Sequence, residues 1–147
     1  MSYKTVANAV QLGRAGELIA MAAFEIAGLK GVLVNQVGFD ILAFDDDGNS
    51  YRVEVKSSSH SQGLNKISYK FMTSTGSSSK KALNKEDADI IVLVALDIKR
   101  IVARCASTLP NKRTSITLDE FDEPETLQIQ RAITEVRKRK NGRAKLG

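Results

Sequence analysis

The chain has 147 residues, with 42% hydrophobic and 27% charged residues and a formal net charge of +5. These values predict one folded domain over residues 1–147 and exclude a wholly disordered chain. No apolar run is long enough to cross a bilayer, and the single cysteine, Cys105, excludes an internal disulfide or a cysteine-rich zinc site.

The first predicted element is an amphipathic helix over residues 4–27. Apolar and small residues recur there every three or four positions, and Gly28 is well suited to follow the last turn. The stripe also contains Glu17, where a carboxylate without a partner would be costly to bury. Gly13 and Gly16 beside it allow another backbone to approach closely. We therefore expect Glu17 to point into the fold. The full stripe is Val6, Val10, Gly13, Glu17, Ala20 and Phe24.

Three strands are predicted next, and the last two form a hairpin. Residues 32–36 are a short apolar run, and segments 39–44 and 50–57 flank a turn made of aspartate, glycine and asparagine. These residue types tolerate the left-handed backbone conformations that tight hairpin turns require. We therefore interpret the aspartates at 45–47 as turn residues rather than metal ligands. A three-residue loop at 46–48 would pair Asp45 with Asn49, which places Asp40 opposite Glu54.

The second half of the chain is predicted to contain three more strands and a closing helix. Residues 66–73 alternate polar and apolar side chains, and residues 89–96 are an unbroken apolar run typical of a buried strand. The other predicted elements are a single helical turn at 84–88, a strand at 101–105 and a helix at 122–140. This order predicts an α/β fold with a mixed sheet flanked by helices, and a basic C-terminal helix or tail from about residue 122.

Two carboxylates and a lysine share one face of the predicted hairpin. Alternate strand side chains lie on the same face, so Glu54 and Lys56 lie together, and Asp40 opposes Glu54 at a Cβ distance of roughly 4.5–5.5 Å. Carboxylates this close raise each other's pKa unless a cation lies between them. Mg²⁺ often uses only one or two carboxylates together with waters and phosphate oxygens, and a nearby lysine can polarise an attacking water.

These residues have the minimum equipment for metal-assisted hydrolysis of a phosphodiester. Glu17, aimed from the helix toward the sheet, would supply a further ligand, directly or through a water. A hairpin with an ordinary solvated charged face would explain Glu54 and Lys56 equally well, and the residues alone leave both interpretations open.

The combination of Glu17, Asp40 and Glu54-Val55-Lys56 resembles the signature of the PD-(D/E)XK nuclease superfamily. Segments 69–71 and 87–91 are similar to those of its group I intron-associated homing endonucleases. Archaeal-type Holliday-junction resolvases are the next most similar branch. The resemblance covers about residues 12–105. It departs from the usual pattern at Phe39, where these enzymes commonly have proline before the first aspartate.

The resemblance implies a restriction-endonuclease-like αβββαβ core and catalysis with Mg²⁺, for which Mn²⁺ is a plausible substitute. It implies that Asp40 and Glu54 are metal ligands and that Lys56 is the catalytic lysine. Glu17 takes the place of an auxiliary catalytic acid and ligand.

Basic residues are unevenly distributed along the chain. Residues 1–50 have a net charge of −3, whereas residues 51–118 have +7 and residues 131–147 have +6. This distribution indicates a polyanionic partner that contacts the later segments, although basic residues that serve only solubility would give the same pattern. His60 fits a loop as well as a phosphate contact. The candidate nucleic-acid contacts are His60, Lys66, Lys70, Lys80, Lys81 and Lys85.

Together these features predict a Mg²⁺-dependent DNA endonuclease, of the homing type and cutting both strands. A Holliday-junction resolvase is the alternative within the same class, and a non-catalytic nucleic-acid-binding module is the alternative outside it. Because the strands of a duplex are antiparallel, cutting both favours two active sites and thus a homodimer or homotetramer. We expect a cytoplasmic protein without a secretory signal, of phage or mobile-element origin, that acts on double-stranded or branched DNA and has no membrane partner.

Overall fold

The computed structural model describes residues 8–36, 38–72, 74–75, 81–82, 88–109 and 113–146. In chain order, its helices and strands are α1 (Ala9–Ile26), β1 (Lys30–Gln36), β2 (Phe39–Phe44), β3 (Ser50–Ser58), β4 (Ser68–Met72), β5 (Ser74–Thr75), β6 (Lys81–Ala82), β7 (Ile90–Ala95), β8 (Arg100–Cys105), β9 (Arg113–Thr117) and α2 (Glu125–Leu146). Short 3-10 turns occupy Leu64–Lys66, Ala106–Thr108 and Leu118–Asp122.

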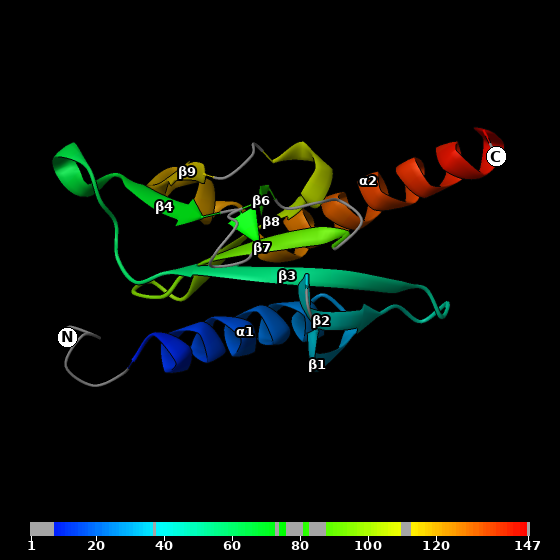
Figure 1. Cartoon of the computed structure of the whole chain (residues 1–147), viewed down its shortest axis with the longest axis horizontal. Helices are drawn as coiled ribbons and strands as arrows, with labels where there is room; N and C mark the ends of the chain where they lie inside the picture. Colours follow the sequence, from blue (N-terminus) through cyan, green and yellow to red (C-terminus); the bar gives the residue numbers. More distant parts are fainter. Residues whose placement is uncertain are drawn as a thin grey trace.

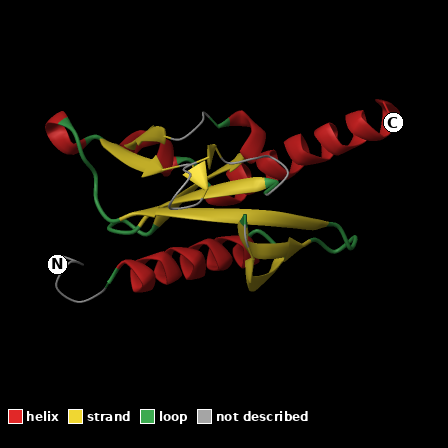
Figure 2. Ribbon diagram, viewed as in Figure 1, coloured by secondary structure: helices red, strands yellow, loops and turns green. Residues whose placement is uncertain are grey.

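A five-stranded mixed sheet with the strand order β1-β2-β3-β7-β8 forms the centre of the protein. Neighbouring strands are antiparallel except for β3 and β7, which run parallel. Helices α1 and α2 pack on one face of this sheet, and the small sheet β4–β9 packs on the other. Figures 1 and 2 show α1 running alongside β3, with β4 and β9 on the other side of β3 from α1. The predicted mixed α/β class, with a sheet flanked by helices, is therefore confirmed. Among the described residues, neither helix is long and apolar enough to cross a membrane.

Helix α1 begins later than predicted because a capping box fixes its start. The Asn8 side chain accepts a hydrogen bond from the Gln11 N–H (2.9 Å), and the Gln11 side chain accepts one from the Asn8 N–H (3.1 Å). Val10 is 81% exposed, so its assignment to the buried stripe was wrong. Val6 lies outside the described residues. The buried face of the helix consists of Gly16, Ala20, Ala23 and Phe24.

The β2–β3 hairpin has the predicted loop and register. The Asp45 N–H donates to the Asn49 carbonyl (3.0 Å), and Gly48 has φ +84°, in the left-handed region that favours glycine. Phe44 pairs with Ser50 and Leu42 with Arg52, as the turn residues predict.

The sheet separates two hydrophobic cores. On β3, Tyr51, Val53 and Val55 point toward the helices and join the larger core. By strand alternation, Glu54 and Lys56 point to the opposite face, which is the face covered by β4 and β9. All six residues of β7 are buried, because this central strand is covered on both sides.

The second half of the chain departs from prediction in several places. Strand β9 and the short strands β5 and β6 were not predicted. Strand β4 begins at Ser68, because Lys66 belongs to the preceding 3-10 turn and has a φ of +53°. Helix α2 begins at Glu125 and continues to Leu146, after a 3-10 turn over part of the predicted span. Residues 84–87 of the predicted helical turn lie outside the described residues.

Candidate active site

The candidate site forms where β2 separates from β3. The pairing between these strands ends at Ile41 and Val53, one position before Asp40 and Glu54 would have paired. The Asp40 carboxylate instead accepts a hydrogen bond from the Val55 N–H at 2.8 Å. The Asp40 side chain thus pairs the Val55 N–H at the point where the backbone of β2 no longer pairs with β3. This bond holds Asp40 beside β3.

Glu54 is the most buried carboxylate of the site, with 8% of its surface exposed. Its carboxylate forms an ion pair with the Lys56 ammonium at 3.0 Å. Burial raises the pKa of Glu54, and the neighbouring Asp40 carboxylate raises it further, while Lys56 opposes both effects. The lysine therefore compensates only part of the unfavourable environment of the buried charge.

Helix α1 brings a third carboxylate to the same place. Glu17 is half-buried, and its pKa is raised by burial and by the charge of Asp40, with Arg14 acting in the opposite direction. Asp40 thus repels both Glu17 and Glu54, and these three carboxylates face two opposing cations, Arg14 and Lys56. This is the electrostatic signature of a place that favours a bound cation.

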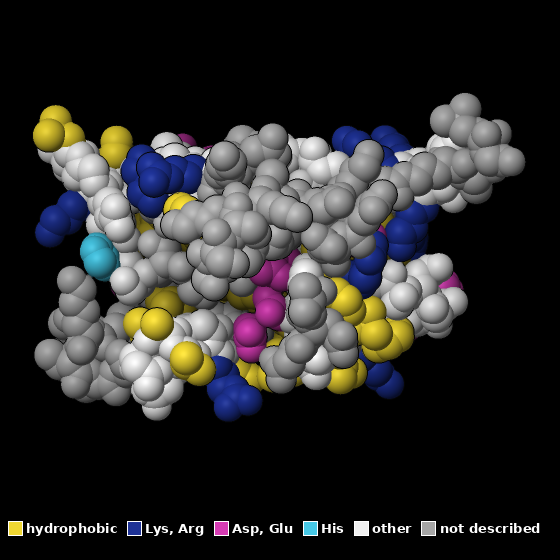
Figure 3. Space-filling model, viewed as in Figure 1, with side chains coloured by type: hydrophobic (Ala, Val, Ile, Leu, Met, Phe, Trp, Pro, Cys, Tyr) yellow, Lys and Arg dark blue, Asp and Glu magenta, His cyan; other side chains and the backbone are white. Residues whose placement is uncertain are grey.

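All four predicted catalytic residues line one cleft of about 410 Å³. Figure 3 shows acidic side chains gathered near the middle of this view, where α1 meets β3. The predictions placed Glu17, Asp40, Glu54 and Lys56 together, and the structure brings them together. The lining consists of Ala9, Leu12, Gly13, Glu17, Asp40, Glu54, Val55, Lys56, Ser57, Ser59 and Leu96.

A glycine determines how closely α1 approaches this cleft. A Cβ atom at Gly16 would lie 1.9 Å from the Ser57 Oγ, so no larger residue fits without movement. A Cβ at Gly13 would meet nothing within 4 Å. Of the two glycines predicted to allow close approach, only Gly16 is packed against the sheet. The Ser57 Oγ is buried and has no hydrogen-bond partner within the described residues.

The residues present fit the predicted magnesium ion. The cleft offers the carboxylates of Asp40, Glu54 and Glu17, and the Ser57 hydroxyl, which are all oxygen ligands. Within the described part of the chain, no three Asp, Glu, His or Cys side chains are grouped closely enough to hold a metal by themselves. Mg²⁺ commonly completes its coordination with waters and substrate oxygens, so one or two carboxylates suffice.

Among the described residues, none of the predicted nucleic-acid contacts lines this cleft. His60 is exposed, and its Nδ1 lies 2.9 Å from the Ser59 Oγ, as fits the loop interpretation. Lys66 is also exposed, in the turn before β4, whereas Lys70 lies on β4 and donates to the Ser115 Oγ at 3.2 Å. Lys81 belongs to β6, and only its backbone is described. Lys80 and Lys85 lie outside the described residues.

Two carboxylates, Asp45 and Asp89, join α2 to the sheet, a role that the sequence did not predict for either of them. Asp45 accepts hydrogen bonds from the Tyr51 hydroxyl (3.1 Å) and from Arg137. The Asp89 carboxylate accepts the Arg52 backbone N–H at 2.9 Å and lies 3.8 Å from the Lys140 Nζ. No signal in the sequence reveals these contacts, because the partners are up to 92 positions apart.

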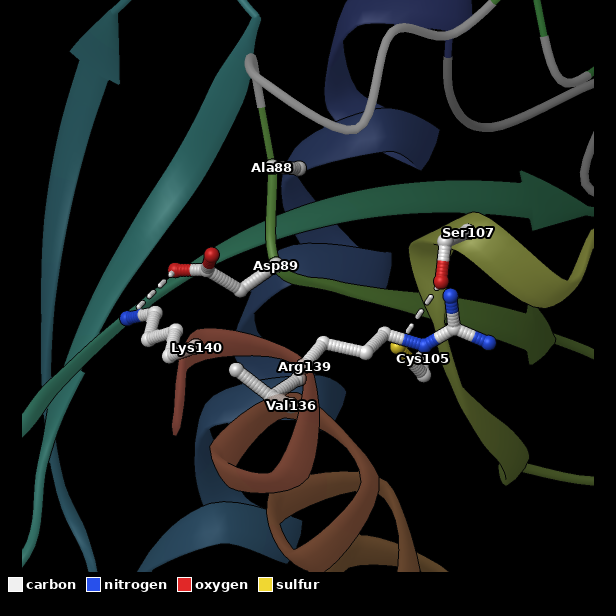
Figure 4. A pocket seen from close by; sticks show the side chains of 7 residues that line it. All are labelled: Ala88, Asp89, Cys105, Ser107, Val136, Arg139 and Lys140. Atoms are coloured by element: carbon white, nitrogen blue, oxygen red, sulfur yellow. Dashed lines mark hydrogen bonds and ion pairs between the residues drawn. The ribbon is translucent and has the colours of Figure 1, made fainter. Parts of the chain in front are cut away.

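Asp89 and Lys140 line a second, much smaller cavity beneath α2 (Figure 4). Its volume is about 30 Å³, which is enough for about one or two waters. Cys105 also lines it, with its Sγ 3.3 Å from the Ser107 Oγ. The cysteine is 5% exposed, in keeping with its interpretation as a core residue, and this cavity is too small for a substrate.

The chain matches no protein-family model and no curated protein. Among solved structures, it is similar to I-Ssp6803I, a bacterial homing endonuclease, with a TM-score of 0.64 and 14% sequence identity. The match covers 88% of this chain and 97% of that chain. At this identity the likeness shows a shared fold, and it extends over nearly the whole length of both chains.

Proposed function

We propose that this protein is a metal-dependent DNA endonuclease that hydrolyses phosphodiester bonds in the cleft between α1 and β3. The observation that carries the proposal is the convergence of Asp40, Glu54 and Lys56, from two strands, on one cleft that has excess negative charge. The fold shared with a homing endonuclease supports the choice of DNA as substrate.

The proposed ion would be held by Asp40 and Glu54, with Glu17 acting as an auxiliary group from α1. When bound, a divalent cation supplies Lewis acidity and makes a coordinated water more acidic. The hydrogen bond from the Val55 N–H already orients the Asp40 carboxylate in the free protein. Such pre-positioning matters because small displacements of catalytic groups reduce rates strongly.

Lys56 is proposed to act on the phosphate that undergoes hydrolysis. In the free protein its ammonium group neutralises part of the Glu54 charge at 3.0 Å. An ammonium group at this position can instead donate to a phosphate oxygen and stabilise the charge that develops as the bond breaks. Glu17 is half-buried in the same lining, and we propose that it orients a water.

The homing type is the proposed subclass, because the similar solved structure is a homing endonuclease. Cutting both strands of a duplex at one site is then expected to require a homodimer or homotetramer, since one chain has one such cleft among its described residues. Exposed Lys66 and Lys70 are proposed to contact phosphates, which would make affinity fall as salt increases.

The test is cleavage by the purified full chain of a supercoiled plasmid library with random inserts, with a synthetic four-way junction as a second substrate. We expect cleavage in Mg²⁺, none in EDTA, and a rate at least about 100-fold lower for Lys56→Ala. Lys30→Ala is the matched control, because Lys30 is exposed at the start of the edge strand β1 and should cut normally.

Each outcome separates the alternatives. Discrete linear products from particular inserts support the homing type, whereas symmetric nicking of the junction alone would transfer the proposal to a resolvase. DNA binding without cleavage of either substrate, in Mg²⁺ or Mn²⁺, would overturn the catalytic proposal in favour of a binding module.

A further inference from the structure

The two-stranded ribbon formed by β4 and β9 has two faces of different character. Tyr69, Phe71 and Ile116 point inward and are at most 3% exposed. The outer face carries the cross-strand pairs Ser68–Thr117, Lys70–Ser115 and Met72–Arg113. The inner face thus attaches the ribbon to the protein, and the outer face presents a row of mostly polar side chains to the surroundings.

The attachment of the ribbon is firm. The rings of Tyr69 and Phe121 meet edge to face at 5.0 Å, and the Tyr69 hydroxyl donates to Asp97 at 2.9 Å. Beyond the end of the pairing, the Leu118 N–H donates to the Ile67 carbonyl at 2.8 Å. A surface held in this way can present its outer side chains in a fixed arrangement, which recognition of a rigid partner requires.

The outer face is cationic and contains no carboxylate among its described residues. It lines a shallow hollow with a volume of about 640 Å³. The Lys70 ammonium donates to the Ser115 hydroxyl at 3.2 Å, a contact that leaves its charge uncompensated, and Arg113 has no ion pair within the described residues. Figure 3 shows Lys and Arg side chains gathered over β4. The lining consists of Gln62, Lys70, Phe71, Met72, Arg113, Thr114 and Ser115.

The ribbon lies on the same side of the central sheet as the side chains of Glu54 and Lys56, whereas Glu17 comes from α1 on the other side. Glu54 and Lys56 are paired in the parallel ladder with Ile91 and Leu93 of β7. Ile91 and Leu93 belong to the core directly beneath the ribbon. A partner held on the outer face of the ribbon is therefore on the side from which Glu54 and Lys56 are approached.

The geometry points to the β4–β9 ribbon as the element that reads DNA bases, inserted into the major groove with Arg113 as the main base-reading side chain. This inference rests on the proposed function, because it identifies how that enzyme would choose its site. The major groove admits a two-stranded β-ribbon, and an arginine there donates two hydrogen bonds to guanine. Ser115 and Thr117 are exposed beside Arg113 and can contact base edges of either kind.

Charge and shape support a duplex as the occupant of this face. A cationic surface without carboxylates attracts phosphates, and the phosphate contacts of Lys70 would hold the ribbon in the groove without reading sequence. The fork of an arginine fits a phosphate as well as a guanine, whereas a lysine keeps the charge and lacks the fork. The replacement of Arg113 by lysine is thus the informative change.

The experiment selects preferred sites from a random duplex library with the wild-type chain in EDTA, where binding is measured without cleavage. Affinity for the selected duplex and for a scrambled duplex is then compared across variants. For Arg113→Ala and Arg113→Lys we expect a loss of about 10- to 100-fold in the ratio of specific to non-specific affinity. Arg113→Lys should keep the salt dependence of non-specific binding, because it keeps the charge. Arg131→Ala is the matched control, since Arg131 is an exposed arginine on α2 that pairs with Glu123.

The outcomes distinguish this inference from the proposed function. If Arg113→Lys keeps the full preference for the selected duplex, the ribbon does not read bases, whether or not the protein cuts DNA. A selected duplex that is bound with an Arg113-dependent preference but never cut would overturn the proposed catalysis and leave the inference standing. Selection that yields no preferred duplex would overturn the inference. Unfolding midpoints within experimental error of the wild type show that the variants are folded.

Discussion

The two ends of the β2–β3 hairpin carry clusters of the same residue types in opposite electrostatic states. At the turn, Asp45 accepts bonds from Asn49, Tyr51 and Arg137, and its pKa lies well below the usual range. At the open end, burial and the charge of Asp40 raise the pKa of Glu54 despite its ion pair with Lys56. One cluster is satisfied by the protein itself, and the other is not.

This difference separates a structural cluster from a candidate catalytic one. A carboxylate that is fully bonded within the protein stabilises the fold and has little to offer a ligand. A buried carboxylate with incomplete compensation destabilises the free protein, and binding of a cation relieves that unfavourable state. Both clusters contain acidic side chains and a basic partner, so composition alone does not distinguish them.

The sharpest test exchanges each carboxylate for its amide. Glu54→Gln should lower the rate of DNA cleavage in Mg²⁺ at least about 100-fold, because it removes a charge proposed to hold the ion. Asp45→Asn should cut at a rate within about twofold of the wild type, because Asp45 lies at the opposite end of the hairpin. The measurement is single-turnover cleavage of a substrate found in the plasmid library. Equal losses in both variants would remove the distinction between the clusters.

A second test concerns the close packing at the open end of the hairpin. Gly16→Ala should lower the free energy of unfolding by about 1–3 kcal/mol, because its Cβ would overlap the Ser57 Oγ. Gly13→Ala is the control on the same helix, and should raise the free energy of unfolding by about 0.5–1 kcal/mol, because it meets no atom and favours the helix. Both values come from urea denaturation.

The combined variant Gly16→Ala with Ser57→Gly tests the cause of this loss. Removal of the Ser57 side chain should restore part of the stability that Gly16→Ala removes. If the second change adds to the loss instead, the overlap at 1.9 Å is not the cause.

A third, smaller effect concerns stability without metal. The folded pKa of Glu54 is raised above its unfolded value, so the stabilisation from its protonated form is present below the unfolded pKa of about 4.3 and is lost as pH rises through the folded pKa. In EDTA, Glu54→Gln should therefore unfold at a higher urea concentration than the wild type at pH 7, with a smaller difference at pH 4.

Addition of Mg²⁺ sharpens this expectation. The proposed ion would bind the folded protein only, so it should raise the unfolding midpoint of the wild type and have little effect on Glu54→Gln. If Glu54→Gln is instead less stable than the wild type at pH 7 in EDTA, the ion pair of Glu54 with Lys56 stabilises the fold by more than the burial of the Glu54 charge destabilises it.

Local sequence predicted the hairpin well, because its turn chemistry and alternation act over a few residues. The register of β2 and β3 follows from Gly48 and from the pairing of Asp45 with Asn49, and it places Asp40 near Glu54. The separation of the strands at Asp40 was not predictable. It depends on a bond from the Val55 N–H to a side chain rather than to the neighbouring backbone.

Strand β9 was not predicted, for a different physical reason. Its sequence, Arg-Thr-Ser-Ile-Thr, contains one buried apolar residue, Ile116, and too little alternation to indicate a strand. It is ordered by its partner β4, which lies about forty-five positions earlier, as in the contact of Lys70 with Ser115. Arg113 was consequently missing from the predicted nucleic-acid contacts, although it faces the same surface as Lys70.

The smallest expected effect concerns the satisfied cluster at the turn. The folded pKa of Asp45 is lowered, first by the side-chain hydrogen bond from Asn49, with Arg137 and Tyr51 contributing, so its stabilisation is present above the unfolded pKa of about 3.9 and is lost as pH falls through the folded pKa. Asp45→Asn should make the decline in stability below about pH 4 less steep and leave the pH dependence between 5 and 8 unchanged. Urea denaturation from pH 2 to 8 measures both regions. If Asp45→Asn changes the pH dependence of stability only near neutral pH, a group other than Asp45 titrates there, because an aspartate with a lowered pKa is already ionised at that pH.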